Sequence, residues 1–258
     1  MDRLIIDGDV HISPTPESPA SLTVEDMIGW LDRAGIDKAL TWLQPPYSRD
    51  IDSSNRYLFE SAQRFPDRIL PFGWADPHLG LDHALRSVHR CIDEFGFYGV
   101  KLNGAQNDFY IDDPTAVAPV IDAIVTSGKL LAFHIGTDAF DKTHPYRLGK
   151  IASRYPETRI LAVHMGGVGF SDVTNAAIEV AEEHDNIVLI ASAVRAGPIL
   201  KAVRRLGAHR VCFGSDMPFE FPHVEVAKFN ALLDGEISPA EKELVMGGNL
   251  ANLLGISS

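Results

Sequence analysis

Carboxylate and imidazole side chains follow several apolar runs of this sequence, at positions where they could act on one metal ion. Asp9 and His11 are two residues apart in an extended segment, so both side chains point to one face and can bind the same ion. His134 and His164 each end a later apolar run, and Asp216 follows the last one. Zinc, manganese and iron accept these ligand types, and a catalytic site leaves one position open for water or substrate. Convergence of all five would therefore indicate a metal-dependent enzyme.

The elements that must position these residues follow one pattern along the chain. Short aliphatic runs alternate with longer helical patterns, which is typical of βα units and a parallel sheet. Eight such units predict an α/β fold, a (β/α)8 TIM barrel with one domain over residues 1–258. In such a barrel the C-terminal ends of all strands surround one shared opening. An open doubly wound sheet is the alternative, but it carries a Gly-rich loop after its first strand, and Asp-Gly-Asp-Val-His stands here. The predicted strands are Leu4–Asp7, Lys38–Leu43, Ile69–Trp74, Gly99–Leu102, Leu130–His134, Arg159–His164, Ile187–Ile190 and Val211–Gly214.

Capping residues mark the helix boundaries. Thr23-Val-Glu-Asp26 resembles a capping box before one helical pattern, and Pro114 precedes another. Glycines that follow helical patterns predict helix ends at Gly35, Gly96, Gly128 and Gly207.

Composition restricts the partners and the location of the protein. The chain has 258 residues, 45% of them hydrophobic and 22% charged, which is typical of a globular protein with a large core. Acids outnumber bases 35 to 23, for a net charge of −12, so we expect no nucleic-acid partner. The sequence has no signal peptide and no apolar stretch of about 18 residues, so we expect a cytoplasmic protein without a membrane partner. The expected partner is a small-molecule substrate, and a homodimer is the default assembly.

Six segments spread over nearly the full length carry a family resemblance: IIDGDVH, YGVKLNG, LAFHIG, SRYPETRILAVHMGG, CFGSDMPF and VMGGNLANLLGI. In this order they resemble the amidohydrolase superfamily, amidohydrolase-2 type, in the branch that contains aminocarboxymuconate semialdehyde decarboxylase and related hydrolases and decarboxylases. The resemblance implies one divalent metal ion held by four residues, which are Asp9, His11, His134 and Asp216. It also implies that His164 stands beside the ion as an acid–base or substrate-polarising group, and some relatives use this histidine as a ligand too.

The identity of the metal depends on one departure from the family pattern. The family usually has His-x-His after its first strand, and this chain has Asp9-Val10-His11. Zinc is the first expectation, but an oxygen ligand shifts the preference toward manganese, magnesium or iron. A barrel that works without an ion, or that binds a small molecule without turnover, is a further alternative, which metal analysis would separate from the metal-dependent enzyme.

Lys101 lies in the fourth predicted strand and has two interpretations. In binuclear members of the superfamily, a lysine in the fourth strand is carbamylated and bridges two ions, which requires a neutral amine and a lowered pKa. Lys101 could instead pair with Asp216 or Asp9, or bind an anionic substrate as a point charge. We favour the pairing, expect a mononuclear site, and count Lys101 with the catalytic residues.

Two reactions suit such a site. In hydrolysis of an ester, lactone or amide, metal-activated water would attack a carbonyl, Asp216 would transfer the proton to the leaving group, and His164 would stabilise the oxyanion. In non-oxidative decarboxylation of an aromatic or unsaturated carboxylic acid, Asp216 or His164 would protonate the carbon that loses carbon dioxide. We expect the hydrolase, because of Lys101 and the short loops, with the decarboxylase as the alternative.

Substrate contacts are expected from residues at the ends of other strands. Arg195, just past the seventh strand, is the best placed bidentate donor for a carboxylate, unless it is a solvated loop residue. Asn103, Trp42 and Trp74 are on the same predicted rim and could line the pocket; the aromatic residues could also form a lid or a subunit contact.

Overall fold

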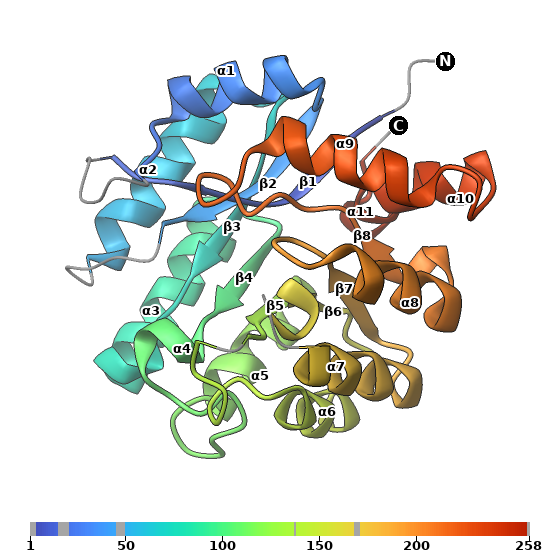
Figure 1. Cartoon of the computed structure of the whole chain (residues 1–258). Helices are drawn as coiled ribbons and strands as arrows, with labels where there is room; N and C mark the ends of the chain where they lie inside the picture. Colours follow the sequence, from blue (N-terminus) through green and yellow to red (C-terminus); the bar gives the residue numbers. More distant parts are fainter. Residues whose placement is uncertain (1–3, 15–20, 45–49, 137, 168–170, 257–258) are drawn as a thin grey trace.

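The computed structural model describes residues 4–14, 21–44, 50–136, 138–167 and 171–256. In this part of the chain eight strands form one sheet in sequence order, and each consecutive pair from β1 to β8 is parallel. The single-domain (β/α)8 barrel predicted from the sequence is therefore confirmed (Figure 1). The strands are β1 (Ile6–Ile12), β2 (Lys38–Leu43), β3 (Ile69–Trp74), β4 (Gly99–Leu102), β5 (Leu130–His134), β6 (Ile160–Val163), β7 (Ile187–Ile190) and β8 (Val211–Cys212).

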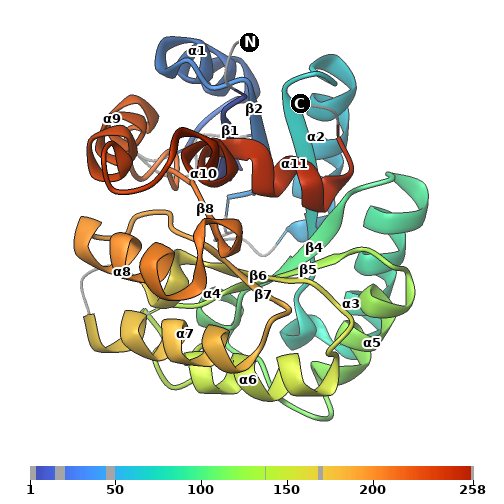
Figure 2. The same cartoon turned by 90° about the vertical axis from the view of Figure 1, so that its right-hand side faces the viewer.

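The helices lie around the outside of the strands, as the two perpendicular views in Figures 1 and 2 show. They are α1 (Val24–Ala34), α2 (Ile51–Arg64), α3 (Leu81–His89), α4 (Gly104–Asn107), α5 (Ala118–Thr126), α6 (Pro145–Arg154), α7 (Ser171–Glu183), α8 (Ala196–Leu206), α9 (Pro222–Leu233), α10 (Pro239–Glu243) and α11 (Asn249–Leu254).

Backbone hydrogen bonds along β1 close the barrel. The N–H of Gly8 donates to the carbonyl of Phe213 (3.0 Å), the N–H of His11 to Met217 (2.8 Å) and the N–H of Asp216 to Asp9 (2.9 Å). Glycine permits this approach at position 8, because a Cβ there would lie 2.7 Å from the Phe213 carbonyl oxygen. The closure places the segment after β8, with Asp216, directly beside Asp9.

Two apolar layers hold the barrel together. The inner layer fills the barrel with side chains such as Phe72, Leu161 and Ile190, and Leu250 of α11 belongs to the same cluster. The outer layer packs the helices against the strands. Burial of this kind stabilises a fold by about 25 cal/mol per Å² of apolar surface, so the strands are held rigidly under the residues at their ends.

Four predicted elements have different boundaries in the structure. β1 begins at Ile6 and continues to Ile12, so Asp9 and His11 lie within the strand and not after it. β6 ends at Val163, and β8 is only Val211–Cys212. Pro114 does not begin a helix, because α5 begins at Ala118.

The predicted cap residues are present at other boundaries. The side chain of Thr23 accepts a hydrogen bond from the N–H of Asp26 at the start of α1. Gly35 ends α1 in a left-handed conformation with φ 67°, as a C-terminal glycine stop requires. Gly96, Gly128 and Gly207 also have positive φ angles.

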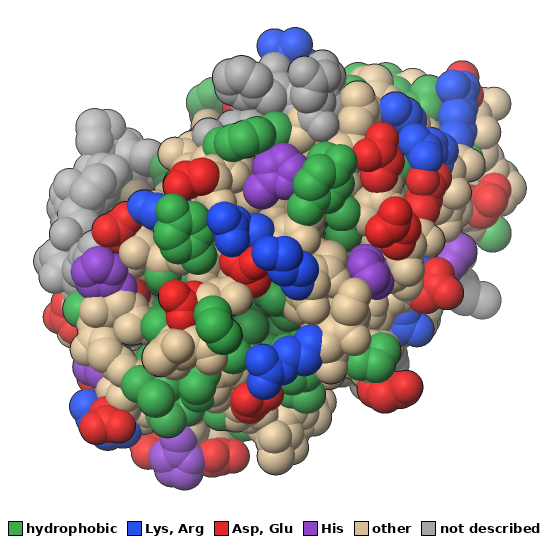
Figure 3. Space-filling model, turned by 90° about the horizontal axis from the view of Figure 1, so that it is seen from below, with side chains coloured by type: hydrophobic (Ala, Val, Ile, Leu, Met, Phe, Trp, Pro, Cys, Tyr) green, Lys and Arg blue, Asp and Glu red, His purple; other side chains and the backbone are tan. Residues whose placement is uncertain are grey.

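Charged side chains of both signs are interspersed on the face shown in Figure 3. Elsewhere in the structure, ion pairs join Asp112 to Arg147 (2.6 Å) and to Lys150 (2.8 Å). Among the residues that the structure describes, no helix has the combination of length and hydropathy that a bilayer crossing needs.

Candidate active site and metal centre

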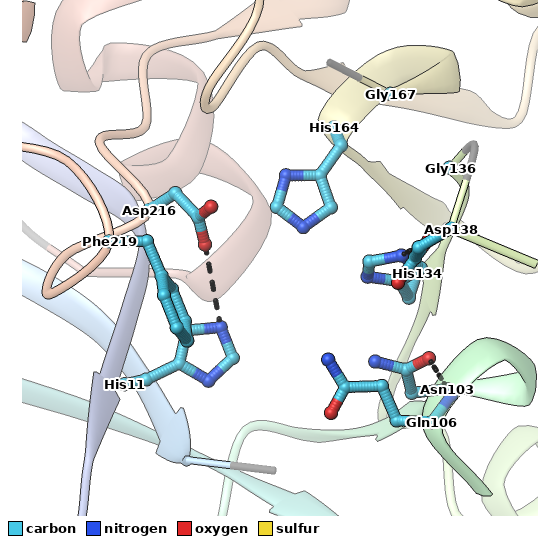
Figure 4. Close-up of a pocket in the computed structure, with 10 residues that line it drawn as sticks. All are labelled: His11, Asn103, Gln106, His134, Gly136, Asp138, His164, Gly167, Asp216 and Phe219. Atoms are coloured by element: carbon cyan, nitrogen blue, oxygen red, sulfur yellow. Dashed lines mark hydrogen bonds and ion pairs between the residues drawn. The ribbon is translucent and has the colours of Figure 1, made fainter. Parts of the chain in front are cut away.

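A pocket of about 260 Å³ opens at the C-terminal ends of the strands (Figure 4). This volume is close to the lower end of the range for small-molecule sites, so it suits a compact ligand. Five predicted site residues reach it from different strands or the loops that follow them. The lining residues are His11, Asn103, Gln106, His134, Gly136, Asp138, His164, Gly167, Asp216 and Phe219.

Asp9 lies at the floor of the site and is fully buried. The Trp42 indole N–H donates to its Oδ1 (2.8 Å), and the Ser192 hydroxyl donates to its Oδ2 (2.5 Å). His11 Nε2 lies 3.4 Å from Asp9 Oδ1. These contacts fix the orientation of the carboxylate from two sides.

The buried acids and one histidine form a cluster with the spacing of metal ligands. Asp9, His164 and Asp216 each place a ligand atom within 4.8 Å of the others. His11 Nε2 is 3.8 Å from Asp216 Oδ1, at the edge of this cluster. Carboxylate oxygens and imidazole nitrogens are ligands for Mn²⁺, Fe²⁺ or Zn²⁺, so the residues present fit a single divalent ion.

The pKa values of the two acids are shifted in opposite directions, as expected for two buried carboxylates that lie close together. Burial opposes ionisation of Asp9, but the positive charge of Lys101 outweighs it and holds the pKa of Asp9 well below its usual range. Burial and the charge of Asp9 raise the pKa of Asp216 well above its usual range. Two carboxylates this close cannot both ionise at low cost unless a positive charge joins them. A divalent ion would supply that charge.

Lys101 is fully buried beneath the pocket. Its Nζ lies 3.5 Å from Asp9 Oδ1 and 3.8 Å from the centre of the Trp42 ring. Burial lowers the pKa of Lys101, while Asp9 and Asp216 raise it. Of the roles considered from the sequence, the structure shows the pairing with Asp9.

Two pocket residues have backbone conformations that L residues rarely adopt. His164 has φ 67° and Asp216 has φ 70°, both in the left-handed region. Such conformations cost about 1–3 kcal/mol each and are concentrated at functional sites. Here they turn the chain directly after β6 and after β8, so that both side chains enter the pocket (Figure 4).

His164 and His134 lie side by side in the pocket, with ring centroids 4.7 Å apart in an edge-to-face arrangement. Burial lowers the pKa of His164 to about 3, so its ring is neutral at physiological pH. Its Nδ1 is 3.0 Å from the Ser192 hydroxyl oxygen. His134 is held from the other side, because its Nε2 is 2.8 Å from Asp138 Oδ1.

Asn103 lines the pocket, but the two tryptophans and the arginine expected to bind substrate do not. The side-chain oxygen of Asn103, Oδ1, accepts hydrogen bonds from the N–H groups of Ala105 and Gln106 (both 3.1 Å), which turns the side-chain amide nitrogen toward the pocket (Figure 4). Trp42 and Trp74 are fully buried below it. Arg195 is exposed at the start of α8, outside the lining residues.

Ser192 and Asp138 are site residues that sequence reasoning missed. Ser192 stands two residues after β7, so the criterion of polar residues at strand ends could have found it. Asp138 lies in the loop after β5, where neither spacing nor periodicity shows which way a side chain points. Its role emerges only from its contact with His134.

Replacing Trp42 by phenylalanine is expected to weaken both the fold and the binding of a divalent ion at this centre, for which Mn²⁺ serves as the probe. The change keeps most of the ring but removes the N–H donor to Asp9, which costs about 1–3 kcal/mol for a buried charged acceptor. Trp74→Phe is the matched control, because its indole N–H donates to Asn107 (2.7 Å) and not to a ligand. Both variants should unfold at a lower denaturant concentration than the wild type, and calorimetry should show weaker Mn²⁺ binding for Trp42→Phe alone. Equal Mn²⁺ affinity of the two variants would contradict this assignment.

Comparison with known proteins identifies the family of this chain and relatives whose reactions are named. The family model described as Amidohydrolase matches residues 48–256. Gamma-resorcylate decarboxylase from Polaromonas sp. (strain JS666) is 26% identical over an alignment of 284 residues in length, gaps included. The alignment covers 86% of this chain and 84% of the relative. The crystal structure of 5-carboxyvanillate decarboxylase from Sphingomonas paucimobilis is similar with a TM-score of 0.80 at 18% identity, covering 99% of this chain and all (100%) of that one. A dihydroxybenzoic acid decarboxylase from Polaromonas sp. JS666, with bound manganese and the inhibitor 2-nitroresorcinol, has a TM-score of 0.77 at 19% identity, covering 98% of this chain and 97% of that one.

These relatives correct the reaction expected from the sequence. All three are named as decarboxylases, so the expectation of a hydrolase acting on an ester, lactone or amide is wrong, and the decarboxylase alternative is better supported. The inference from Lys101 failed for a physical reason. A buried lysine beside Asp9 fixes a carboxylate equally well for either reaction, so it does not discriminate between them.

Proposed function

Because the chain belongs to the amidohydrolase family and is an enzyme of that type, we propose that it is a metal-dependent, non-oxidative decarboxylase of a small aromatic carboxylic acid. The observation that carries the proposal is the likeness to gamma-resorcylate decarboxylase over 86% of the chain. The compact pocket, with the Phe219 ring at its edge, supports a substrate with a single ring. We propose that residues 1–258 act as one catalytic domain, and the homodimer, the cytoplasmic location and the lack of nucleic-acid and membrane partners stay predictions.

We propose one Mn²⁺ ion for the centre. Asp9, Asp216 and His164 would hold it, with His11 and His134 beside them as the further ligands that the family resemblance implies. Two carboxylates make the centre hard, which favours manganese over zinc, and a structural relative carries manganese. When bound, such an ion supplies positive charge for a carboxylate or phenolate oxygen of the substrate.

Asp216 is the proton donor in this proposal: one oxygen of its carboxyl group would face the ion, and the other would carry the proton. Its carboxyl group lines the pocket and reaches the space where a ring would lie (Figure 4). The proton goes to the ring carbon that bears the carboxylate, the carbon–carbon bond then breaks, and its electron pair returns to the ring as carbon dioxide leaves. The new C–H bond replaces the lost carboxylate, and Asp216 regains a proton from solvent. General acid catalysis of this kind contributes about 10²–10⁴-fold.

The other pocket residues orient the ring. The Asn103 amide nitrogen can donate to a substrate oxygen, because its carbonyl is already engaged by the backbone. Phe219 packs edge-on against His11, with centroids 5.9 Å apart, at the side of the pocket. Lys101 acts through Asp9, and Trp42 and Trp74 support the floor. The exposed position of Arg195 supports no contact with substrate.

The proposed function predicts carbon dioxide release by Mn²⁺-loaded protein from a panel of hydroxybenzoates, including 2,6-dihydroxybenzoate and 5-carboxyvanillate. The phenol product should form in equal amount. In D₂O the product should carry one deuterium at the carbon that lost the carboxylate, because the proton comes from an exchangeable acid. Failure of every hydroxybenzoate with Mn²⁺, Mg²⁺ and Zn²⁺ would overturn the proposal.

A further inference from the structure

Asp138 contacts a proposed site histidine from outside the metal cluster. Its Oδ1 lies 2.8 Å from His134 Nε2, and both residues line the pocket. His134 is largely buried, whereas the side chain of Asp138 is half exposed. The His134 ring is therefore clamped between this carboxylate and the His164 ring, whose centroid is 4.7 Å away.

Gly136, between His134 and Asp138 in the sequence, leaves the space that this pair occupies. A Cβ at Gly136 would lie 2.8 Å from His134 Nε2 and 2.9 Å from Asp138 Oδ1, closer than real Cβ atoms approach other atoms. Gly136 is not among the residues with a positive φ angle, so its backbone conformation does not require glycine. The space that the hydrogen-bonded pair occupies is the feature that requires it.

The chemistry of the two groups fixes which nitrogen carries the proton. An ionised carboxylate only accepts hydrogen bonds, so Nε2 must donate. On a neutral ring the second nitrogen, Nδ1, then keeps its lone pair. Carboxylates that hold a histidine in this way also orient the ring and make its free nitrogen more basic.

We infer that Asp138 is a positioning residue that holds His134 as the Nε2–H tautomer, in the space that Gly136 leaves free. The lone pair of Nδ1 is then the one left for the proposed ion or the substrate. The catalytic consequence rests on the proposed function, whereas the tautomer and the clamp do not. Asp138 thus acts through His134 and not by direct contact with the reacting atoms.

The first test observes the proton directly. Protein labelled with ¹⁵N-histidine and loaded with diamagnetic Zn²⁺ should give a one-bond ¹H–¹⁵N signal for His134 Nε2, because a hydrogen-bonded imidazole proton exchanges slowly with water. The signal should be lost in Asp138→Ala and in Gly136→Ala. It should persist in Asp141→Ala, which removes an exposed acid of the same loop, and in Gly29→Ala, where a new Cβ meets nothing within 4 Å. A proton on Nδ1 of the wild type, or a signal unchanged in Asp138→Ala, would overturn the inference.

The second test asks whether Asp138 acts through His134. Asp138→Ala should lower kcat about 10- to 100-fold with KM changed less than about threefold, and Asp138→Asn, which keeps an acceptor oxygen, should lose less. In a His134→Gln background, Asp138→Ala should change kcat less than about twofold. Independent, multiplying effects of the two substitutions would refute the positioning role. If no hydroxybenzoate is decarboxylated, the proposed function fails while the ¹⁵N measurement still decides the tautomer.

Discussion

Replacing Asp216 by asparagine is expected to reduce kcat/KM for decarboxylation by about 10²–10⁴-fold and to weaken Mn²⁺ binding. Asparagine cannot carry the proton that the ring carbon needs. It also removes one of the two carboxylates that face the ion, since Asp9, His164 and Asp216 lie within 4.8 Å of one another. Progress curves of carbon dioxide release and calorimetric titration with Mn²⁺ measure both losses.

The same substitution should stabilise the metal-free protein. Burial and the charge of Asp9 raise the pKa of Asp216 well above its usual range, so the ionised side chain is unfavourable in the fold. An amide of the same shape removes that cost, and the denaturation midpoint without metal should rise. Glu157→Gln, an exposed acid in the turn between α6 and β6, is the control and should leave stability and turnover unchanged. A turnover number near that of the wild type for Asp216→Asn would exclude this residue as the donor.

Such opposite effects on stability and activity are expected where a site stores strain and uncompensated charge. Asp216 and His164 both have left-handed backbone conformations, although neither is glycine. These conformations could not be predicted from the sequence, because Asp and His occur in ordinary conformations almost everywhere else. They become necessary only when short turns must bring two side chains back over the barrel.

The convergence of the site, in contrast, could be predicted. All strands of a parallel barrel end at one mouth, so His134, His164 and Asp216 had to meet once eight units were recognised. The spacing of Asp9 and His11 correctly places both on one face, and their side-chain atoms lie 3.4 Å apart. The depth of Asp9 was not predictable in this way, because β1 continues to Ile12 and sinks Asp9 to the floor of the site.

The features of the site that could not be predicted depend on contacts between residues far apart in sequence and on the local backbone. Trp42 was expected to line the pocket as an aromatic rim residue, and it lies instead below it as a donor to Asp9. Arg195 follows β7 as predicted, but α8 begins directly after it and leaves its side chain exposed. Position along the chain locates a residue at a rim, whereas the local backbone decides whether its side chain enters the mouth.

Replacing Lys101 by methionine is expected to lower the free energy of unfolding of the metal-free protein by about 3–5 kcal/mol. Methionine fills a similar volume, but the Asp9 carboxylate loses the ammonium that lies 3.5 Å away. A buried carboxylate without its cation must either take up a proton or remain as an unpaired charge, and both lower the stability of the folded state. Urea unfolding at neutral pH, with the metal removed by a chelator, measures the loss.

Mn²⁺ should reverse most of this loss, because a bound ion places positive charge beside Asp9 in the variant. One positive charge fewer also surrounds the ion, so its dissociation constant should fall about tenfold, which corresponds to about 1.4 kcal/mol. Lys201→Met, at an exposed position of α8, should change stability by less than about 0.5 kcal/mol with or without Mn²⁺. An equal loss of stability in the presence and absence of Mn²⁺ would mean that Lys101 stabilises the fold independently of the metal centre. Because the buried ammonium and the proposed ion would both stabilise the charge of Asp9, each should weaken the other, and calorimetry and unfolding together measure that coupling from both sides.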